Sequence, residues 1–324
     1  MPITTRRSGC FVQNYALWYR QFGDPVRTLQ LEISKLPSLA DGVVRARMNA
    51  APINPSDLIP ITGAYRHRVA PPRIAGYEGV GTVVDAAGHA NLTVGQRILP
   101  LRGPGTWQTY IDTDPEWIIP VPDHASDAAA VQGYINPLTA LLMLRKWPVR
   151  GKHVLLTAAG SSCANLLAQW AFAEGARSVA GIYRSAKHVP RLLQIGVTPI
   201  DAEAFGQIAS VAAHSDTAFD AVGGTLASRV LTCMKPGASF ISYGLLSGSP
   251  FAVGPSGPAP QRFHLRDHIA TAAASEWRNW FREIWPRLAR SRLPDISPYR
   301  LNDWKDALAL FYASGRASKP VLKM

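Results

Sequence analysis

The feature that most constrains the fold is the alternation of strand and helix signals after Gly151. The first of these segments, 152–157, has the pattern of a buried strand, 160–162 that of a turn and 165–175 that of a helix. Further strands are expected at 178–183, 217–222 and 239–243, and further helices at 187–195 and 226–234. Strands that alternate with helices form a parallel sheet covered by helices on both faces. The sequence therefore predicts an α/β domain wound around such a sheet.

The first part of the chain has a different pattern. Short apolar runs broken by Gly, Pro and Asp fill 15–113 and predict strands at 29–33, 42–50, 79–84, 96–99 and 108–111. A helical segment between Asp127 and Trp147 is expected to link this all-β region to the α/β domain. The tail predicts a helix over 302–314 and a strand over 319–323 that could return to the β region.

Length and composition fit two domains. A chain of 324 residues exceeds the usual ceiling for one hydrophobic core. We expect a β domain formed by 1–125 and 295–324, and an α/β domain formed by 126–294. The chain has neither a long uninterrupted apolar run nor an ordered signal peptide, so we expect a soluble, cytoplasmic protein. Arg6 and Arg7 in an acid-free start leave a transit peptide as an alternative.

The net charge of +12 raises the question of a polyanionic partner. Arg and Lys are scattered, and no aromatic-basic module is present, so a phosphate-bearing cofactor or a thioester explains the charge better than nucleic acid. Cys10, Cys163 and Cys233 lie far apart. They form neither a disulfide framework nor a metal knuckle, and we expect reduced thiols.

A nucleotide site is predicted where the strand 152–157 meets the helix that follows. A tight turn into a helix directs free amides at a pyrophosphate, and the small residues Gly160, Ser161, Ser162 and Cys163 would allow its close approach. Gly160 is the only glycine in this turn, so an ordinary β–α turn is an equal alternative.

The end of the next strand predicts which cofactor binds. An acidic residue at this position is typical of NAD binding, but the stretch contains Tyr183, Arg184, Ser185 and Lys187. Arg184 and Lys187 could pair with a 2′-phosphate, and Ser185 could donate a hydrogen bond to it. NADPH is therefore the expected cofactor, with a solvated surface pair as the alternative.

Several motifs then indicate a family. In the β region these are Asn54-Pro-Ser-Asp57, Gly63-Ala-Tyr65 and Gly76-Tyr-Glu-Gly-Val-Gly81, followed by Gly105-Thr-Trp-Gln108 and Asn136-Pro-Leu-Thr-Ala140. They resemble signatures of the medium-chain dehydrogenase/reductases, in particular the mitochondrial-type 2-enoyl thioester reductases. The resemblance extends over nearly the whole chain, including 221–224, 242–244 and 303–324.

The resemblance implies a GroES-like β domain, a Rossmann domain that binds NADPH, and a homodimer. It places Asn136, Thr139, Gly223, Tyr243 and Gly244 beside the cofactor, although Asn136 and Thr139 could simply cap a helix. Zinc-dependent relatives have Cys and His where this chain has Asn54 and Tyr77. No metal is therefore expected, and reduction of an electron-poor alkene is favoured over alcohol oxidation.

The resemblance also implies a mechanism. Hydride would reach the β carbon of the enoyl substrate, and the tyrosine of the Gly-x-Tyr motif, Tyr65, would protonate the α carbon. A phenol suits this role because its ordinary pKa of about 10 keeps it protonated at neutral pH. Tyr65 could instead be a loop aromatic that only packs. Asn54 joins it as a catalytic candidate that, with Asp57, orients the loop.

The acyl pocket is where the sequence departs from the family. The enoyl reductases have bulky aromatic residues where this chain has Thr271-Ala-Ala-Ala274. Trp277, Trp280, Phe281 and Trp285 recur at helical spacing, which favours core packing over an acyl cavity. A 2-enoyl thioester on CoA or acyl carrier protein is the first expected substrate, and a quinone or small enone the second. A cofactor-binding protein without turnover is a third, non-enzymatic hypothesis.

Overall fold

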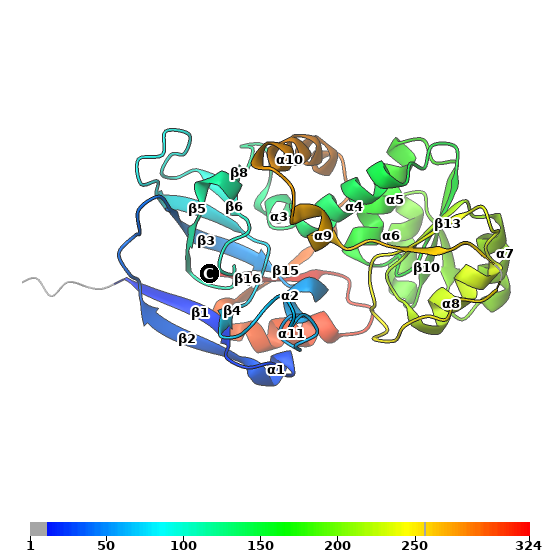
Figure 1. Ribbon diagram of the computed structural model, residues 1–324, viewed down its shortest axis with the longest axis horizontal. Helices are drawn as coiled ribbons and strands as arrows, with labels where there is room; N and C mark the ends of the chain where they lie inside the picture. Colours follow the sequence, from blue (N-terminus) through cyan, green and yellow to red (C-terminus); the bar gives the residue numbers. More distant parts are fainter. Residues whose placement is uncertain (1–11, 256) are drawn as a thin grey trace, which may run out of the picture. The chain divides into compact units, whose positions relative to one another are not determined.

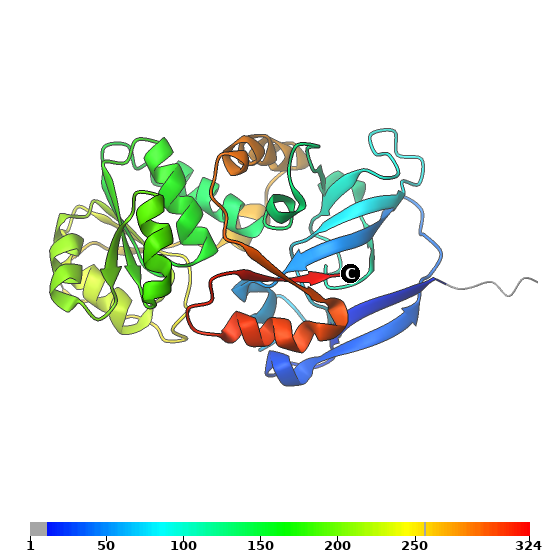
Figure 2. The ribbon, with the colours of Figure 1, turned by 180° about the vertical axis from the view of Figure 1, so that it is seen from behind.

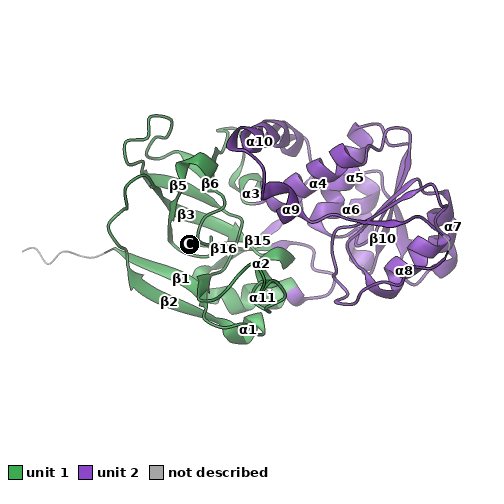
Figure 3. Ribbon diagram, in the orientation of Figure 1, with its two compact units in different colours: residues 1–131, 297–311, 320–324 green, residues 132–296, 312–319 purple. Residues whose placement is uncertain are grey.

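The computed structural model describes residues 12–255 and 257–324, and these divide into two compact units (Figure 1, Figure 3). Unit 1 contains residues up to 131 together with 297–311 and 320–324, and unit 2 contains 132–296 and 312–319. The sequence placed the boundaries at 125 and 294 and assigned the whole tail to the β domain. Residues 312–319 instead group with unit 2. Arg6, Arg7 and Cys10 lie outside the described residues.

Unit 1 is built mainly from strands. Its elements are β1 Gln13–Tyr19, α1 Pro25–Thr28, β2 Leu29–Lys35, β3 Val44–Pro52, α2 Pro55–Leu58, β4 Arg73–Ile74, β5 Val80–Asp85, β6 Arg97–Pro100, β7 Tyr110–Thr113, η1 Pro115–Trp117, β8 Ile118–Pro120, α3 Asp127–Ala130, β15 Ile296–Arg300, η3 Leu301–Asp303, α11 Trp304–Tyr312 and β16 Lys319–Lys323. One sheet has the order β2–β1–β4 and a larger one β15–β16–β3–β5–β6–β8, with β7 paired to β3.

The C-terminal strand returns to unit 1, as the sequence predicted. Strand β16 pairs antiparallel with β3, with Val321 opposite Pro52 and Leu322 opposite Ala51 (Figure 2). The core beneath it contains Ile53, Trp107 and Leu322, all almost fully buried. A core residue from the last strand therefore packs beside the loop that follows β3.

Unit 2 alternates strands and helices. Its elements are α4 Ile135–Lys146, β9 His153–Leu156, α5 Ser162–Ala173, β10 Ser178–Tyr183, η2 Ala186–His188, α6 Val189–Gln194, β11 Thr198–Asp201, α7 Phe205–His214, β12 Thr217–Asp220, α8 Gly224–Cys233, β13 Ser239–Ser242, β14 Pro260–Arg262, α9 Leu265–Ile269 and α10 Ala274–Ala289. The strands pair in parallel in the order β11–β10–β9–β12–β13–β14.

This strand order determines where a ligand can bind. The chain moves outward from β9 to β10 and β11, then returns to β12 on the other side of β9. Because the connections between parallel strands are right-handed, the reversal puts the helices before and after it on opposite faces. Ligands of such sheets bind beyond the carboxyl ends of the strands at the reversal. These ends are the turns after β9, β10 and β12.

The predicted α/β winding is confirmed, although the sequence missed several elements. β1, β4 and β8 of unit 1 and β11, α7 and β14 of unit 2 were not predicted. The strand expected over 217–222 ends at Asp220, because the carboxylate of Asp220 accepts hydrogen bonds from the amides of Val222 and Gly223 and turns the chain. The single helical segment expected between Asp127 and Trp147 is two helices, α3 and α4.

The aromatic stripe of α10 is core, as the sequence favoured. Trp277, Trp280, Phe281 and Trp285 are all less than a tenth exposed. The ring of Tyr134 lies 5.6 Å from Trp277 and 6.3 Å from Phe281, centroid to centroid. The stripe therefore stabilises unit 2 by packing α10 against the start of α4.

Candidate functional site

The Asn54–Asp57 motif in unit 1 forms a buried hydrogen-bonded frame. Asn54 precedes α2, and its backbone amide donates to a carboxylate oxygen of Asp57 at 2.7 Å. The other oxygen of Asp57 accepts from the amide of Tyr77, and the side-chain amide of Asn54 donates to Glu78 at 2.8 Å. All three polar side chains of the frame, those of Asn54, Asp57 and Glu78, are at most 3% exposed. Asn54 therefore holds two loops together.

The glycines of the neighbouring motifs are required by close packing. Gly76 has φ +90°, and a Cβ built on it would lie 2.3 Å from the Trp107 ring. Gly105 has φ +117°, and its Cβ would lie 2.5 Å from the carbonyl oxygen of Ile74. The Thr106 hydroxyl donates to the carbonyl oxygen of Glu78 at 2.8 Å. The 76–81 and 105–108 motifs are thus two sides of one packed contact.

Tyr65 lies in a turn-rich segment that follows α2. It is half-buried and packs against the core of unit 1, and its ring meets that of His67 edge-on with centroids 6.3 Å apart. The backbone amide of Val69 donates to the carbonyl oxygen of Tyr65 at 2.9 Å. Arg66, His67 and Arg68, which follow Tyr65, are exposed. The segment therefore fixes the tyrosine backbone while three basic residues face solvent.

In unit 2 the turn between β9 and α5 begins the expected nucleotide site. The Ser161 hydroxyl caps α5 by accepting from the amide of Ala164, and Ser162 and Cys163 open the helix. The left-handed backbone belongs to Ala158, with φ +48°, rather than to Gly160. A Cβ on Gly160 would lie 2.4 Å from the imidazole of His188. The glycine that the sequence assigned to phosphate approach thus makes room for a histidine.

Two arginines bring positive charge close to this turn, and a histidine lies beside them. Arg191 donates to the carbonyl oxygen of Gly160 at 2.7 Å. Burial lowers the pKa of Arg191 and of Arg316 below the ordinary arginine value. The pKa of His188 is lowered by burial first and then by the charges of Arg191 and Arg316. The two guanidinium groups are the cations of this region, and the imidazole of His188 beside them is disfavoured from carrying a charge.

The residues expected to select NADP lie from the last residue of β10 into η2. Tyr183 and Ser185 are half-buried, whereas Arg184 and Lys187 are exposed. A Cβ on Gly315 would lie 2.4 Å from the Ser185 hydroxyl oxygen and 3.7 Å from a side-chain carbon of Lys187. The segment 312–319 therefore lies directly against this loop.

The turn after β12 is held by an acid that the sequence analysis did not single out. Thr157 donates to Asp220 at 2.6 Å and accepts from the amide of Ala221 at 2.9 Å. Asp220 also accepts from the amide of Gly223, which has φ +71° and caps α8. Burial raises the pKa of Asp220. This network fixes the ends of β9 and β12 together at the sheet reversal.

Cys163 and Tyr243 meet at the same edge of the sheet. The hydroxyl oxygen of Tyr243 is buried beside Cys163 and Ser161, although the residue as a whole is only half-buried. Burial raises the pKa of the Cys163 thiol to about 12 and the pKa of Tyr243 well above its ordinary value. Both groups are therefore neutral at physiological pH. A Cβ on Gly244 would lie 2.8 Å from the carbonyl oxygen of Ala221.

Asn136 and Thr139 lie inside helix α4, whose N-cap is Tyr134. The alternative that they cap a helix is therefore wrong. Thr139 is 8% exposed and Asn136 half-buried. Both belong to unit 2, and their place beside a cofactor stays a prediction.

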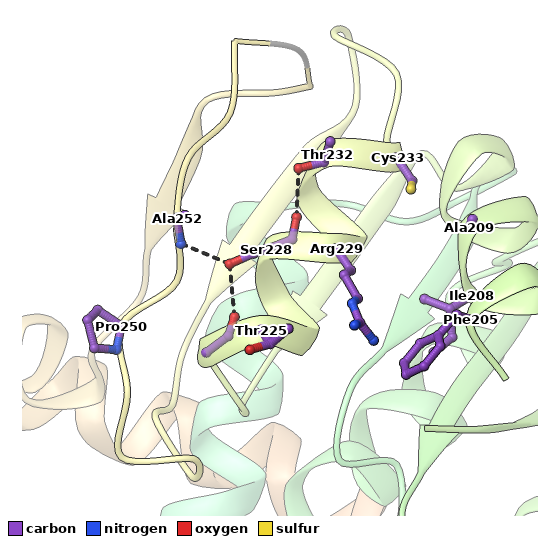
Figure 4. Close-up of a pocket in the computed structure, with 11 residues that line it drawn as sticks. Phe205, Ile208, Ala209, Thr225, Ser228, Arg229, Thr232, Cys233, Pro250 and Ala252 are labelled. Carbon is purple, nitrogen blue, oxygen red and sulfur yellow. Dashed lines mark hydrogen bonds between the residues drawn. The ribbon is translucent and has the colours of Figure 1, made fainter. Parts of the chain in front are cut away.

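A separate cavity of about 610 Å³ lies between α7, α8 and the segment 250–252 (Figure 4). Its centre is Ser228, whose hydroxyl donates to the carbonyl oxygen of Gly224 and accepts from the amide of Ala252. At its side the guanidinium of Arg229 stacks on the ring of Phe205 at 3.7 Å. None of the predicted cofactor residues lines this cavity. It adjoins the turn after β12 at Gly224, the first residue of α8, and none of its lining residues comes from the turns after β9 and β10.

Within the described residues, no cluster of three or more His, Cys, Asp or Glu is arranged to hold a metal ion. Cys163 is a buried free thiol and Cys233 a half-buried one. No helix in the described part of the chain combines the length and the hydropathy needed to cross a membrane.

Comparison with known proteins identifies the family. Residues 40–123 match the alcohol dehydrogenase GroES-like domain. The chain is 33% identical to a structure from Bacillus thuringiensis named an NADPH:quinone reductase, with a TM-score of 0.88 over 97% of this chain and 99% of that one. The chain belongs to the zinc-free branch of the medium-chain dehydrogenase/reductases.

Other members of this family are named for enoyl reduction. The human mitochondrial enoyl-[acyl-carrier-protein] reductase is 28% identical over 335 residues, which cover 95% of this chain and 88% of the relative. A structure of the Candida tropicalis protein Etr1p with NADP and crotonyl-CoA is 17% identical, with a TM-score of 0.81 over 97% of this chain and all of that one. At 17% identity, the likeness to Etr1p shows a shared fold and no more.

Sequence reasoning missed His188, Arg191, Arg316 and Asp220. Asp220 lies inside the strand predicted over 217–222, and a lone acid in that apolar run could have drawn attention to it as the carboxyl end of the strand. Arg316 lies 125 residues after Arg191 in the chain. No local spacing relates these two residues. Only the fold of the segment 312–319 brings Arg316 close enough to His188 for its charge to act there together with that of Arg191.

Proposed function

We propose that this protein is an NADPH-dependent reductase of the carbon–carbon double bond of a 2-enoyl thioester, carried by CoA or acyl carrier protein. The observation that carries the proposal is the half-buried Tyr65, which lies between Asn54 and Glu78 of the buried frame, in a chain with relatives named enoyl reductases. The motifs that hold the frame are those on which the family resemblance rests.

The cofactor part of the proposal depends on unit 2. Residues at the β9–α5 turn and the β10–α6 loop fit a dinucleotide phosphate, because they combine a capped helix N-terminus with cationic side chains. Ser161 and Ser162 would hold the pyrophosphate, and Ser185, Arg191 and Arg316 the 2′-phosphate. NADPH, when bound, supplies the hydride.

Tyr65 would supply the proton that completes the reduction. Its hydroxyl would transfer its proton to the α carbon of the substrate as negative charge develops on the thioester carbonyl. Asn54 acts through the loop geometry: its bond to Glu78 and that of Asp57 to Tyr77 keep the segment from 54 to 78 in one arrangement. We therefore assign Asn54 as a positioning residue.

The test compares Tyr65→Phe with wild type. NADPH oxidation, followed by cofactor absorbance, is measured with crotonyl-CoA and, separately, with a quinone. Loss of a positioned proton donor should lower kcat for the thioester by about 100-fold or more. Tyr15→Phe is the matched control, because Tyr15 packs against the same core and its hydroxyl bonds only to Gln13 among the contacts described. Thioester turnover that is equal in Tyr65→Phe and wild type would refute the proton-donor role.

A quinone or small-enone reductase is the second candidate function. The 33% identity to the structure named a quinone reductase exceeds the 17% to Etr1p. Residues 271–274 are small, whereas the family resemblance implies bulky aromatics there in an enoyl reductase. Quinone turnover that is indifferent to Tyr65→Phe, without thioester turnover, would establish this function instead.

Two finer points accompany the proposal. A homodimer, expected from the family resemblance, predicts a particle of twice the chain mass of 35.1 kDa in light scattering. The human relative is named mitochondrial, so the expected cytoplasmic location awaits fractionation of the source cells.

A further inference from the structure

His188 lies in an unusual place for a surface-loop histidine. Its imidazole packs against Gly160 so closely that a Cβ on that glycine would approach three ring atoms within 2.8 Å. Gly160 belongs to the β9–α5 turn, and His188 ends the short helix η2 after β10. The ring therefore bridges the two loops that meet a dinucleotide phosphate in this fold.

The charges around His188 are mostly of one sign. Arg191 comes from α6 and Arg316 from the segment 312–319, and the charges of both act on His188. Lys187 precedes His188 in η2, and Arg184 lies before η2. Two acids of unit 2 interact with other groups. Asp295 interacts with Arg191, and Asp201, which is paired in register with Tyr183, accepts from the amide of Glu203. Without a bound anion, a proton on His188 would be repelled by two guanidinium groups.

We propose that His188 takes up a proton when the 2′-phosphate of NADPH binds, so that the protein holds this cofactor more tightly in mildly acidic than in alkaline solution. This inference rests on the proposed NADPH site. The proton comes from solvent and converts the neutral imidazole into an imidazolium, which forms a charge-assisted hydrogen bond to the phosphate.

The sign of the linkage follows from the two states. In the free protein, burial and the two arginines disfavour the charged imidazole and lower the pKa of His188. A bound dianion reverses the repulsion and raises the pKa of His188 relative to the free state. Any ligand that raises a pKa binds more tightly as the proton concentration rises, because binding and protonation are reciprocal. NAD, which lacks the 2′-phosphate, should show little of this effect.

The experiment measures binding of NADP⁺ and NAD⁺ by titration calorimetry at pH 6.5 and 8.0 in buffers of different ionisation enthalpy. The variants are His188→Gln, which stays neutral, and His188→Lys, which stays charged. The control is His214→Gln on α7, where the imidazole contacts only the carbonyl oxygen of Ser210 among the contacts described. The second ionisation of a phosphate monoester lies near pH 6, so each variant is compared with wild type at the same pH.

Wild type and His214→Gln should bind NADP⁺ roughly three- to tenfold more tightly at pH 6.5 than His188→Gln does, with the difference gone at pH 8.0. They should also take up a fraction of a proton that His188→Gln does not. His188→Lys should bind tightly at both pH values. If both wild type and His188→Gln bind NADP⁺ and their affinities depend on pH equally, the inference about His188 is overturned and the proposed cofactor site is not. Absence of NADP⁺ binding by every form would overturn the proposed cofactor site as well.

Discussion

The two units place their candidate functional residues in opposite ways. In unit 1 the motif residues satisfy one another: Asn54 bonds to Glu78, Asp57 to Tyr77, and Gly76 packs on Trp107. In unit 2 the imidazole of His188 packs against Gly160, and the charges of Arg191 and Arg316 disfavour its protonation. The first arrangement is complete without a ligand. The second is the one that the proposed NADPH site would complete. We therefore expect substitutions in unit 1 to change stability and substitutions in unit 2 to change binding.

The largest effect is expected for Gly76→Ala in unit 1. Alanine at φ +90° is strained, and its Cβ would overlap the Trp107 ring. We expect a loss of about 3 kcal/mol in the free energy of unfolding, from backbone strain together with overpacking. Urea unfolding followed by tryptophan fluorescence measures it. Gly88→Ala is the control, because Gly88 has φ +77° but nothing within 4 Å of its Cβ. Equal losses in the two variants would show that packing on Trp107 is unimportant.

Asn54→Ala tests the buried frame of unit 1. The substitution removes the donor to Glu78 and leaves a fully buried carboxylate with one partner fewer. An expected loss of about 2 kcal/mol follows from the cost of an unsatisfied buried group. Asn49→Ala removes a part-buried bond to Thr82 in the same sheet and should lose less, about 1 kcal/mol. The frame interpretation fails if Asn49→Ala is the more damaging of the two in urea unfolding.

Arg316→Met tests unit 2 and should affect binding rather than stability. NADP⁺ affinity should fall about tenfold, the effect of one charge-assisted contact, whereas NAD⁺ affinity should not change. The thermal midpoint should stay equal or rise, because a cation whose pKa is lowered by burial is removed. The exposed Arg184, which the sequence favoured, provides the comparison in tryptophan-fluorescence titrations. A larger loss of NADP⁺ affinity in Arg184→Met than in Arg316→Met would indicate that the 2′-phosphate binds to the residues predicted from the sequence.

The same contrast explains what the sequence could and could not predict. The motifs of unit 1 were found because residues that contact one another there, such as Asn54 and Asp57, also lie close along the chain. The alternation in unit 2 predicted its parallel sheet, because period and turn signals are local. Arg316 escaped prediction because its neighbour Arg191 lies far away in sequence. Gly160 signals close approach without saying which group approaches: the structure shows the imidazole of His188 there, and the approach of a phosphate stays a prediction.

The smallest effect concerns the acid stability of the ligand-free protein. The pKa of His188 is lowered in the folded state, so the unfolded chain binds a proton more readily. Stability is therefore full above the ordinary histidine pKa of about 6.5 and falls as pH drops below it. His188→Gln should reduce this fall, measured as the difference in thermal midpoint between pH 7.5 and 5.5. His268, whose pKa is also lowered by burial, contributes in the same direction in both proteins and so cancels.

An excess of NADP⁺ should reduce the fall in stability of wild type and leave that of His188→Gln unaltered. The reason is that the negative charge of the bound phosphate would favour the protonated imidazole, which the positive arginines disfavour. A fall that NADP⁺ leaves unchanged in wild type would separate His188 from the phosphate site.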